Sequence, residues 1–300
     1  ATLGTGDTLI ITDPGTSATG GQVLARVTLA DGRTVDSLAL AGWNMPVTAG
    51  WRIPGSEHLL LARASSSRNG VFVLVARAGA VLDSLDPVLA TVFNPLGAGI
   101  RWGATIPETK SGDVVVVLGP GIRGLCAAVA AKEAGASFVA LTGLGPRDRD
   151  RLDIAHRFGV DLAIDVALDD PTAALKRATG GLADVVVDVT AKAPAAFAQA
   201  VALARPGGTI VVAGTRGGGG APGFEPDHLV YKELRIMGSL GVDFHAYRAA
   251  IDLLVAGRWP FADLSRRVAG FGDLSALLDT LSGADRDAIP PLHGVFSPSA

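Results

Sequence analysis

Residues 113–124 read DVVVVLGPGIRG, and this stretch decides the fold. It opens with the apolar run Val114–Leu118, which is continuous, as in a strand that is buried on both faces. A glycine-rich turn comes directly after it, and the Ala-rich segment Leu125–Ala134 beyond the turn predicts a helix. A strand, a turn with three spaced glycines and a helix, in this order, are the context of a dinucleotide-binding turn.

Each glycine of this turn has a physical role. Gly119 permits the tight turn, Gly121 lets the backbone approach a pyrophosphate, and Gly124 lets the helix sit close to the sheet. The start of the helix offers unpaired N–H groups and a partial positive charge to phosphates. The alternative is a purely structural turn in a chain with 39 glycines. The predicted cofactor-binding residues of the turn are Gly119, Gly121, Ile122, Arg123 and Gly124.

Strands and helices alternate after the turn. Six strands are expected in all, which predicts an α/β fold with a doubly wound parallel sheet. The further strands are expected at 138–141, 162–164, 185–189, 209–213 and 234–238, and helices at 149–158, 172–178 and 194–203. Ligands bind at the carboxyl ends of the strands in such sheets. The candidate cofactor residues at these ends are Val189, Thr190, Ala213, Gly214 and Thr215.

The end of the second expected strand bears on the choice of cofactor. An NAD site usually has Asp or Glu there to bind the ribose hydroxyls, but this chain has Thr142 and Gly143. Arg147 and Arg149 come next, and an arginine suits the 2′-phosphate of NADP. We therefore expect NADP(H) to be favoured over NAD(H). Alternatively, the two arginines begin a solvated helix, or Asp148 binds the ribose.

The sequence pattern differs before and after this run of alternating strands and helices. Residues 1–100 contain short β-type runs cut by Gly, Pro and Asp, which predicts a β-rich barrel or sandwich. After Gly241 the pattern is mixed, with helices expected at 245–256 and 271–281. We expect residues 241–300 to return to the first domain, so that residues 101–240 form an inserted nucleotide-binding domain. The β-type runs include 23–29, 59–62 and 71–75.

Four stretches carry a resemblance to a known family. They read GDVVVVLGPG at 112–121, ADVVVDVT at 183–190, ARPGGTIVVAG at 204–214 and KELRIMGS at 232–239. In this order they resemble the medium-chain dehydrogenase/reductase superfamily, the relatives of zinc alcohol dehydrogenase. The resemblance covers residues 86 to about 260. It implies an NAD(P)-dependent oxidoreductase with a Rossmann domain inserted in a GroES-like catalytic domain, here shortened. It also implies a homodimer paired through Leu234–Leu240.

The family's zinc ligands are not found at the matching positions. Arg33 aligns with the first cysteine and Leu38 with the histidine of the same motif, whose aspartate aligns with Asp36. Ser56 stands where the second histidine would be, and Asn94 stands at the last ligand position. A catalytic zinc needs three protein ligands from Cys, His, Asp or Glu. We therefore expect no zinc.

The residue counts support the same expectation without an alignment. The one cysteine, Cys126, lies in the predicted nucleotide-domain helix, where we expect it to be buried. The five histidines are scattered without metal-ligand spacing. They are His58, His156, His228, His245 and His293.

Without a metal, the resemblance favours a quinone- or enoyl-type reductase that delivers hydride to an activated C=C, with the substrate carbonyl held by hydrogen bonds. Hydride transfer to or from a carbonyl without zinc, a nucleotide-binding sensor without turnover, and a redox-neutral lyase or cyclase remain alternatives. Each candidate catalytic residue has an alternative, purely structural interpretation, as a helix cap, a turn residue or a surface group. For Asn94 we expect an extended backbone, because a proline comes after it. These candidates are Asp36, Asn44, Glu57, His58 and Asn94.

Charge and hydropathy limit the partners. The chain carries 26 basic and 29 acidic side chains, a formal net charge of −3, so no basic excess is present to bind nucleic acid. The sequence has no apolar run of membrane-spanning length, and we expect no signal peptide. A single cysteine favours a reducing compartment. We expect a cytoplasmic protein that binds a small-molecule substrate.

Overall fold

The computed structural model describes residues 85–191, 193–217, 220–282, 284 and 290–297, together with the backbone of five strands nearer the N-terminus. The chain divides into two units, Ala1–Leu85 and Asp86–Ala300. In the first unit, two strands form one antiparallel pair and three form a second antiparallel sheet. The strands are β1 (Val23–Thr28), β2 (Thr34–Leu40), β3 (Ala49–Arg52), β4 (His58–Ala64) and β5 (Val71–Arg77).

The second unit is built on a six-stranded parallel sheet, as the sequence predicts. Its order is β11-β10-β9-β6-β7-β8, so the chain leaves the central strand first to one side and then to the other. The boundary between β6 and β9 is the switch point of the sheet, where such folds bind ligands. The strands are β6 (Val114–Leu118), β7 (Phe138–Gly143), β8 (Leu162–Asp165), β9 (Ala183–Asp188), β10 (Ala204–Val212) and β11 (Arg235–Gly238).

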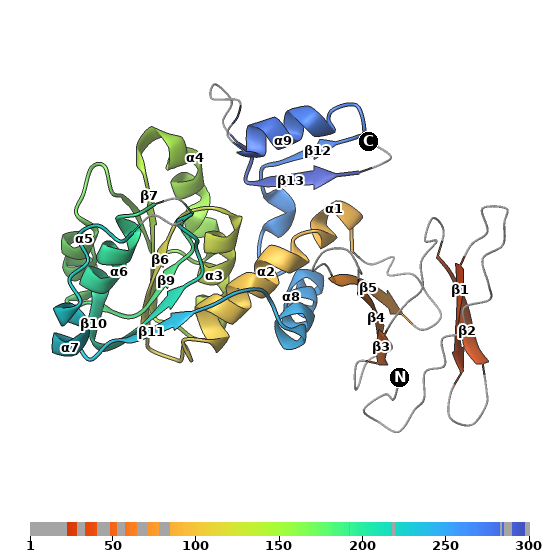
Figure 1. Ribbon diagram of the computed structural model, residues 1–300, viewed down its shortest axis with the longest axis horizontal. Coiled ribbons are helices and arrows are strands. Elements are labelled where there is room, and N and C mark those ends of the chain that lie inside the picture. The colour runs from red at the N-terminus through yellow and green to blue at the C-terminus, as the bar shows by residue number, and fades with distance from the viewer. Residues whose placement is uncertain are drawn as a thin grey trace. The chain divides into compact units, whose positions relative to one another are not determined.

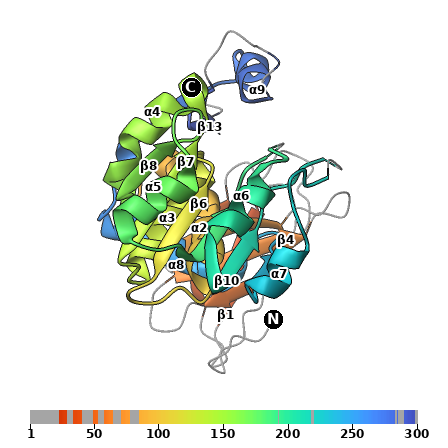
Figure 2. The same ribbon diagram turned by 90° about the vertical axis from the view of Figure 1, so that its left-hand side faces the viewer.

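Helices cover both faces of this sheet. In Figure 1, α5 and α6 lie to the left of the central strands and α3 lies to the right; Figure 2 gives a second view. The core consists of the valines of β6 and β9 and the apolar faces of these helices, and it includes Cys126, which is buried as expected. The helices are α3 (Ile122–Glu133), α4 (Gly145–Ile154), α5 (Pro171–Thr179), α6 (Ala196–Leu203) and α7 (Asp227–Tyr231), with a 3-10 turn at Ala155–Phe158.

Three more helices flank the sheet in the chain. They are α1 (Pro87–Ala90), α2 (Phe93–Ile100), which continues into a π-helical turn at Arg101–Thr105, and α8 (Phe244–Ala256). α2 packs between α3 and α8. The expectation of an extended backbone at Asn94 is wrong, because Asn94 lies in the first turn of α2. Proline is tolerated there because the N–H that Pro95 lacks has no helical partner in a first turn.

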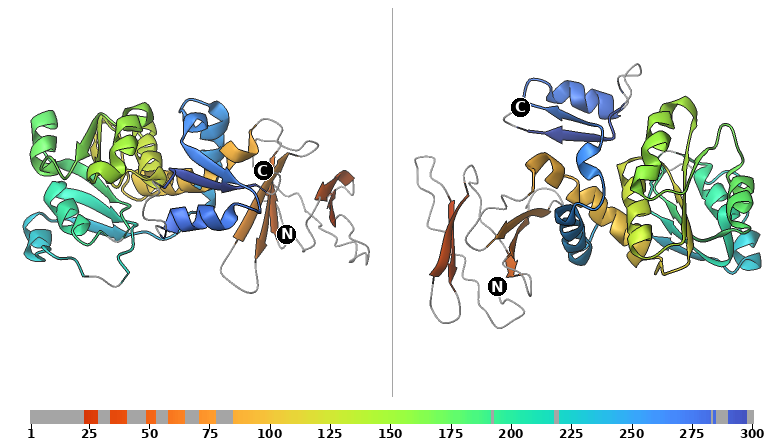
Figure 3. Two further views of the ribbon diagram at one scale, coloured as in Figure 1. Left: turned by 90° about the horizontal axis from the view of Figure 1, so that it is seen from above. Right: turned by 180° about the vertical axis from the view of Figure 1, so that it is seen from behind.

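The C-terminal part of the second unit forms a small layer of its own, seen from above and from behind in Figure 3. Strands β12 (Arg266–Ala269) and β13 (His293–Phe296) pair in parallel and pack against α9 (Leu274–Ser282), after a 3-10 turn at Phe261–Asp263. The domain boundaries expected at residues 100 and 240, and the return of residues 241–300 to the first domain, stay predictions. None of the helices in the described parts of the chain has the length and hydropathy to cross a membrane.

Candidate nucleotide-binding site

The glycine turn after β6 has the geometry that its sequence predicts. Gly119 has a φ of +105°, a conformation that side chains rarely adopt, and its N–H donates to the carbonyl of Thr142 over 3.1 Å. A Cβ at Gly124 would overlap the carbonyl oxygen of Gly119, so only glycine lets α3 begin this close to β6. A Cβ at Gly121, the N-cap of α3, would meet nothing within 4 Å. The turn therefore has an open face at the start of a helix.

The loops after β6 and β9 touch at the switch point. The N–H of Val189 donates to the carbonyl of Leu118 over 3.1 Å, and the methyl group of Thr190 would lie 3.3 Å from a Cβ at Gly119. A Cβ at Gly214 would overlap the carbonyl of Thr190. The structure thus brings Val189 and Thr190 beside the predicted phosphate-binding turn, and Gly214 beside Thr190. Ala213 precedes Gly214 in this loop, and Thr215 after it is exposed.

Two charged residues at this edge were not among the predicted site residues. Asp188 is fully buried at the end of β9, and its carboxylate pairs with Arg216, whose side chain is 12% exposed. Asp188 was visible in the sequence only as part of the ADVVVDVT stretch, and nothing local marks Arg216. Their meeting depends on the pairing of β9 with β10, which sequence spacing does not reveal.

The end of β7 holds the residues expected to choose between cofactors. Gly143 offers no carboxylate, and Asp148 is buried with its carboxylate accepting from the N–H of Leu144 over 3.0 Å and from Arg151 over 3.3 Å. That carboxylate therefore serves the start of α4. Arg147 is 75% exposed and lies 4.0 Å from Asp148, and Arg149 is also exposed.

At the start of α3, Ile122 is half-buried and Arg123 is exposed. The guanidinium of Arg123 lies 5.9 Å from the centroid of the Trp102 ring, a cation–π distance. Arg123 is therefore held against the π-helical turn that continues α2, at the N-terminal end of α3.

The candidate catalytic residues lie mostly in the first unit. Asn44 and Glu57 are outside the described residues, and for Asp36 in β2 and His58 in β4 the backbone alone is described. Asn94 lies in the second unit, where its amide Nδ2 donates to the hydroxyl of Tyr247 over 2.8 Å. The gathering of these residues around one substrate stays a prediction. Among the described side chains, no group of three or more His, Cys, Asp or Glu forms a metal site.

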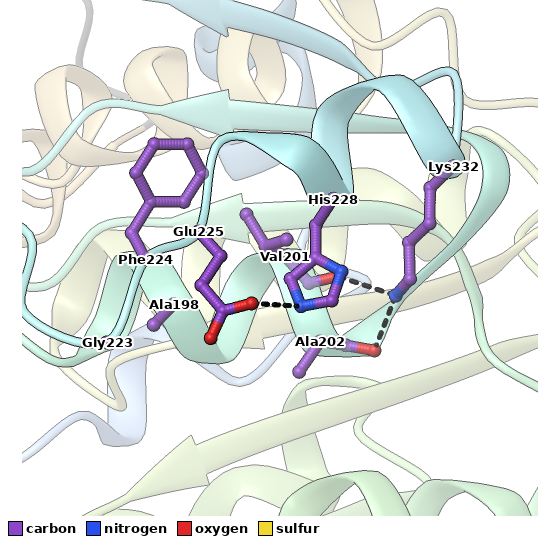
Figure 4. A pocket seen from close by; sticks show the side chains of 8 residues that line it. All are labelled: Ala198, Val201, Ala202, Gly223, Phe224, Glu225, His228 and Lys232. Atoms are coloured by element: carbon purple, nitrogen blue, oxygen red, sulfur yellow. Dashed lines mark hydrogen bonds and ion pairs between the residues drawn. The ribbon is translucent and has the colours of Figure 1, made fainter.

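A surface pocket between α6 and α7 is a separate feature (Figure 4). One of its lining residues, Lys232, donates to the carbonyls of Val201, Ala202 and Ala204 over 2.8, 3.1 and 2.9 Å. Burial lowers the pKa of Lys232, with a smaller contribution from Lys176. All three ammonium protons are used to cap the C-terminus of α6. The ammonium group in this pocket therefore stabilises the helix and is not free to bind a ligand.

Comparison with known proteins gives matches of two kinds. A family model described as zinc-binding dehydrogenase matches residues 124–256. A probable alcohol dehydrogenase of Mycobacterium tuberculosis strain H37Rv is 70% identical over 219 residues, which is 73% of this chain and 59% of that protein. The chain therefore spans less than two thirds of the length of this relative.

Solved structures share the fold. An alcohol dehydrogenase of Thermotoga maritima has a TM-score of 0.64 and 20% identity, covering 76% of this chain and 60% of its own. A protein described as a short chain alcohol dehydrogenase of Escherichia coli CFT073, solved in complex with NADH, has a TM-score of 0.60 and 21% identity, covering 77% of this chain and 67% of its own. The match to the zinc-binding dehydrogenase model and the 70% identical relative, together with the parallel sheet and the glycine turn at its switch point, identify the chain as a member of the medium-chain dehydrogenase/reductase superfamily.

Proposed function

We propose that the protein is an NADP(H)-dependent oxidoreductase that transfers hydride to or from a small organic substrate without zinc. The observation that carries this proposal is the turn Gly119–Gly124, which presents an open face and a helix N-terminus at the switch point of the sheet. The relatives named alcohol dehydrogenase support the oxidoreductase chemistry, and the neighbour in complex with NADH supports the binding of a nicotinamide dinucleotide.

In this proposal, the two halves of the sheet bind different parts of the dinucleotide. The N–H groups at the start of α3 bind the pyrophosphate, and Gly121 leaves room for it. The adenosine half lies towards Thr142, Gly143 and β7, and the nicotinamide half towards Thr190 and Gly214 after β9 and β10. The bound nicotinamide supplies or accepts the hydride.

The charges at the end of β7 favour NADP(H) over NAD(H). The carboxylate of Asp148 is used within α4. The carboxylate of Asp165, which lies opposite Gly143 on β8, accepts from the N–H groups of Gly145 and Ala167 over 2.8 and 2.9 Å, so both carboxylates near the end of β7 serve the backbone rather than the ribose. Arg147 and Arg149 are exposed and come shortly after Gly143, where they meet the 2′-phosphate.

Zinc does not fit the residues at the positions that the family uses to ligate it. Arg33, Leu38 and Ser56 are not zinc ligands, and the amide of Asn94 is already hydrogen-bonded to Tyr247. We therefore propose the reduction of an activated C=C or a carbonyl, with hydrogen-bond donors stabilising the charge that develops on the substrate oxygen. Asn44 and His58 are the candidate donors, and Asp36, Glu57 and His58 are the candidates for proton transfer.

Two alternative functions share the nucleotide site and differ in their chemistry. A sensor would bind the nucleotide and turn nothing over, which the missing zinc ligands also favour. A lyase or cyclase would reuse the pocket without net oxidation.

We also propose a cytoplasmic homodimer. Strand β11 lies at the edge of the sheet, and apolar side chains near it are exposed, including Ile236 and Leu240. An unpaired strand edge with exposed apolar groups suits pairing with a second copy. Sedimentation as a monomer would contradict this proposal.

The test begins with a titration of the purified protein with NADPH and NADH, monitored by the nicotinamide fluorescence. We expect NADPH to bind more tightly. If neither binds, the proposal is wrong. With NADPH bound, loss of nicotinamide absorbance on adding enones, quinones or aldehydes is expected from the enzyme and not from the sensor. Metal analysis of the purified protein tests the absence of zinc, because a near-stoichiometric zinc content would contradict a zinc-free site.

A further inference from the structure

An ion pair lies buried where β9 and β10 end. The carboxylate of Asp188 has no exposed surface, and Arg216 packs its guanidinium 5.8 Å from the centroid of the Phe197 ring. Taking two charges out of water is costly, and replacing such a pair by apolar residues is often neutral or stabilising. Stability alone therefore does not account for this pair.

Asp188 ties two loops together. Its carboxylate oxygen Oδ1 accepts from the backbone N–H of Thr190 over 3.0 Å and from the hydroxyl of Thr190 over 2.6 Å. Its backbone carbonyl accepts from Ala213 over 2.9 Å and from Gly214 over 3.0 Å. Its other carboxylate oxygen pairs with Arg216, from the loop after β10. One residue thus fixes the loops that come after β9 and β10.

The same contacts reach the phosphate-binding turn. Thr190 packs on Gly119 through its methyl group, and its carbonyl fills the space that a side chain at Gly214 would occupy. A shift of Thr190 would therefore change its packing against both Gly119 in the turn and Gly214 in the loop after β10. These loops lie on the β9 and β10 side of the switch point, away from Arg147 and β7.

We propose that Asp188 and Arg216 are positioning residues for the nicotinamide half of the cofactor, acting through Thr190 and Gly214. This inference rests on the proposed nucleotide binding. It assigns the pair no contact with the reacting atoms. It predicts that loss of the pair affects the whole dinucleotide but leaves binding of the adenosine fragment unchanged, because that fragment occupies the β7 half.

The experiment compares Asp188→Asn, Arg216→Gln and the double variant with the wild type. Asp188→Asn keeps an oxygen for Thr190 and removes the charge that pairs with Arg216, while the double variant removes both charges. Each single variant is expected to weaken NADPH binding by about tenfold or more, because it leaves one buried charge without its partner. The double variant is expected to recover most of the lost affinity, because it leaves no unpaired buried charge. Binding of 2′,5′-ADP should change by less than about twofold in all three.

Arg177→Gln is the matched control, because it removes an exposed ion pair with Asp169 next to α5. We expect it to change neither affinity. Equal losses of NADPH and 2′,5′-ADP binding in the single variants would overturn the inference, as would unchanged NADPH binding. If Asp188→Asn does not fold, Arg216→Gln carries the same comparison. A wild type that binds 2′,5′-ADP and NADPH while the variants behave identically to it rejects the inference but not the proposed function.

Discussion

At the scale of single residues, the three glycines of the turn are not equivalent. Gly124 is required by the fold, because its missing side chain makes room for the carbonyl of Gly119. Gly121 has free space beside it and needs no glycine for folding. The reason for a glycine at position 121 is therefore sought in the ligand that binds there, and this can be measured.

Gly121→Ala is predicted to separate binding from folding. The added methyl group fills the space proposed for the pyrophosphate, so we expect NADPH affinity to fall about tenfold, or about 1.4 kcal/mol. The melting temperature should stay close to that of the wild type, because the new Cβ meets no protein atom. Gly181→Ala, which also adds a Cβ in open space, is the control and should change neither quantity. Unchanged NADPH binding in Gly121→Ala would contradict the placement of the pyrophosphate.

The arginines after β7 give a second prediction at this scale. Arg147→Ala and Arg149→Ala should each weaken NADPH binding by about tenfold, because a charge-assisted hydrogen bond to the 2′-phosphate is lost. NADH, which has no such phosphate, should be affected by less than about twofold on the same reasoning. Fluorescence titrations with both nucleotides check this, with Arg177→Ala on α5 as the control. Equal effects on NADPH and NADH would remove the argument for NADP(H).

At the scale of elements, the sequence pattern did not predict α2, nor the shorter helices α1 and α7. Gly97, Gly99 and Gly103 lower the intrinsic helix propensity of α2 and its π-helical continuation, and Pro95 comes directly after Asn94. Tertiary packing overrides that preference. A Cβ at Gly99 would overlap the backbone of Cys126 on α3, and one at Gly103 would overlap the carbonyl of Ala127. Two of the glycines that weaken the local pattern are therefore those that allow the two helical segments to pack backbone to backbone.

Gly99→Ala should therefore destabilise the protein, although alanine is the better helix former by about 1 kcal/mol. The overlap with the backbone of α3 cannot be relieved by a side-chain rotation, so we expect a loss of about 1–3 kcal/mol in the free energy of unfolding. Gly97→Ala is the comparison, since its Cβ would meet the Val242 side chain at 2.9 Å, and a side chain can move. Urea unfolding should give the larger loss for Gly99→Ala. Equal losses would contradict backbone contact as the cause.

At the scale of the whole molecule, a contact between described side chains links the strand pair β12–β13 to the helices before the sheet. His293 in β13 lies 2.7 Å from the hydroxyl of Thr91, between α1 and α2, through its ring nitrogen Nε2. Burial lowers the pKa of His293, and the nearby charge of Arg266 lowers it further. The folded protein therefore favours neutral His293.

This shift makes stability depend on pH with a defined sign. Because the pKa is lower in the folded state, the unfolded chain binds the proton first, and stability falls as the pH drops below the unfolded pKa of about 6.5. We expect the free energy of unfolding to decrease between about pH 7.5 and about pH 5, and His293→Gln to reduce this decrease. His156→Gln removes an exposed histidine and should not. An identical pH dependence in wild type and His293→Gln would show that His293 does not contribute.

The sequence by itself determined the parallel sheet, the glycine turn and the likeness to the dehydrogenase family. These depend on short-range patterns: apolar runs such as Val114–Leu118, and glycine spacings whose steric consequences are local. The lack of a carboxylate at Gly143 is likewise plain from the sequence. Whether Asp148 replaces that carboxylate was open until the structure showed it bound to the start of α4.

Only the tertiary structure decided which distant residues meet. The pairing of Asp188 with Arg216, the contact of Thr190 with Gly119 and the bond from Asn94 to Tyr247 join separate elements. No periodicity encodes such contacts, because they result from strand order and helix packing rather than from neighbours along the chain. For the same reason the sequence identified the turn proposed to bind phosphate, while the residues proposed to position the other half of the cofactor came from the folded chain.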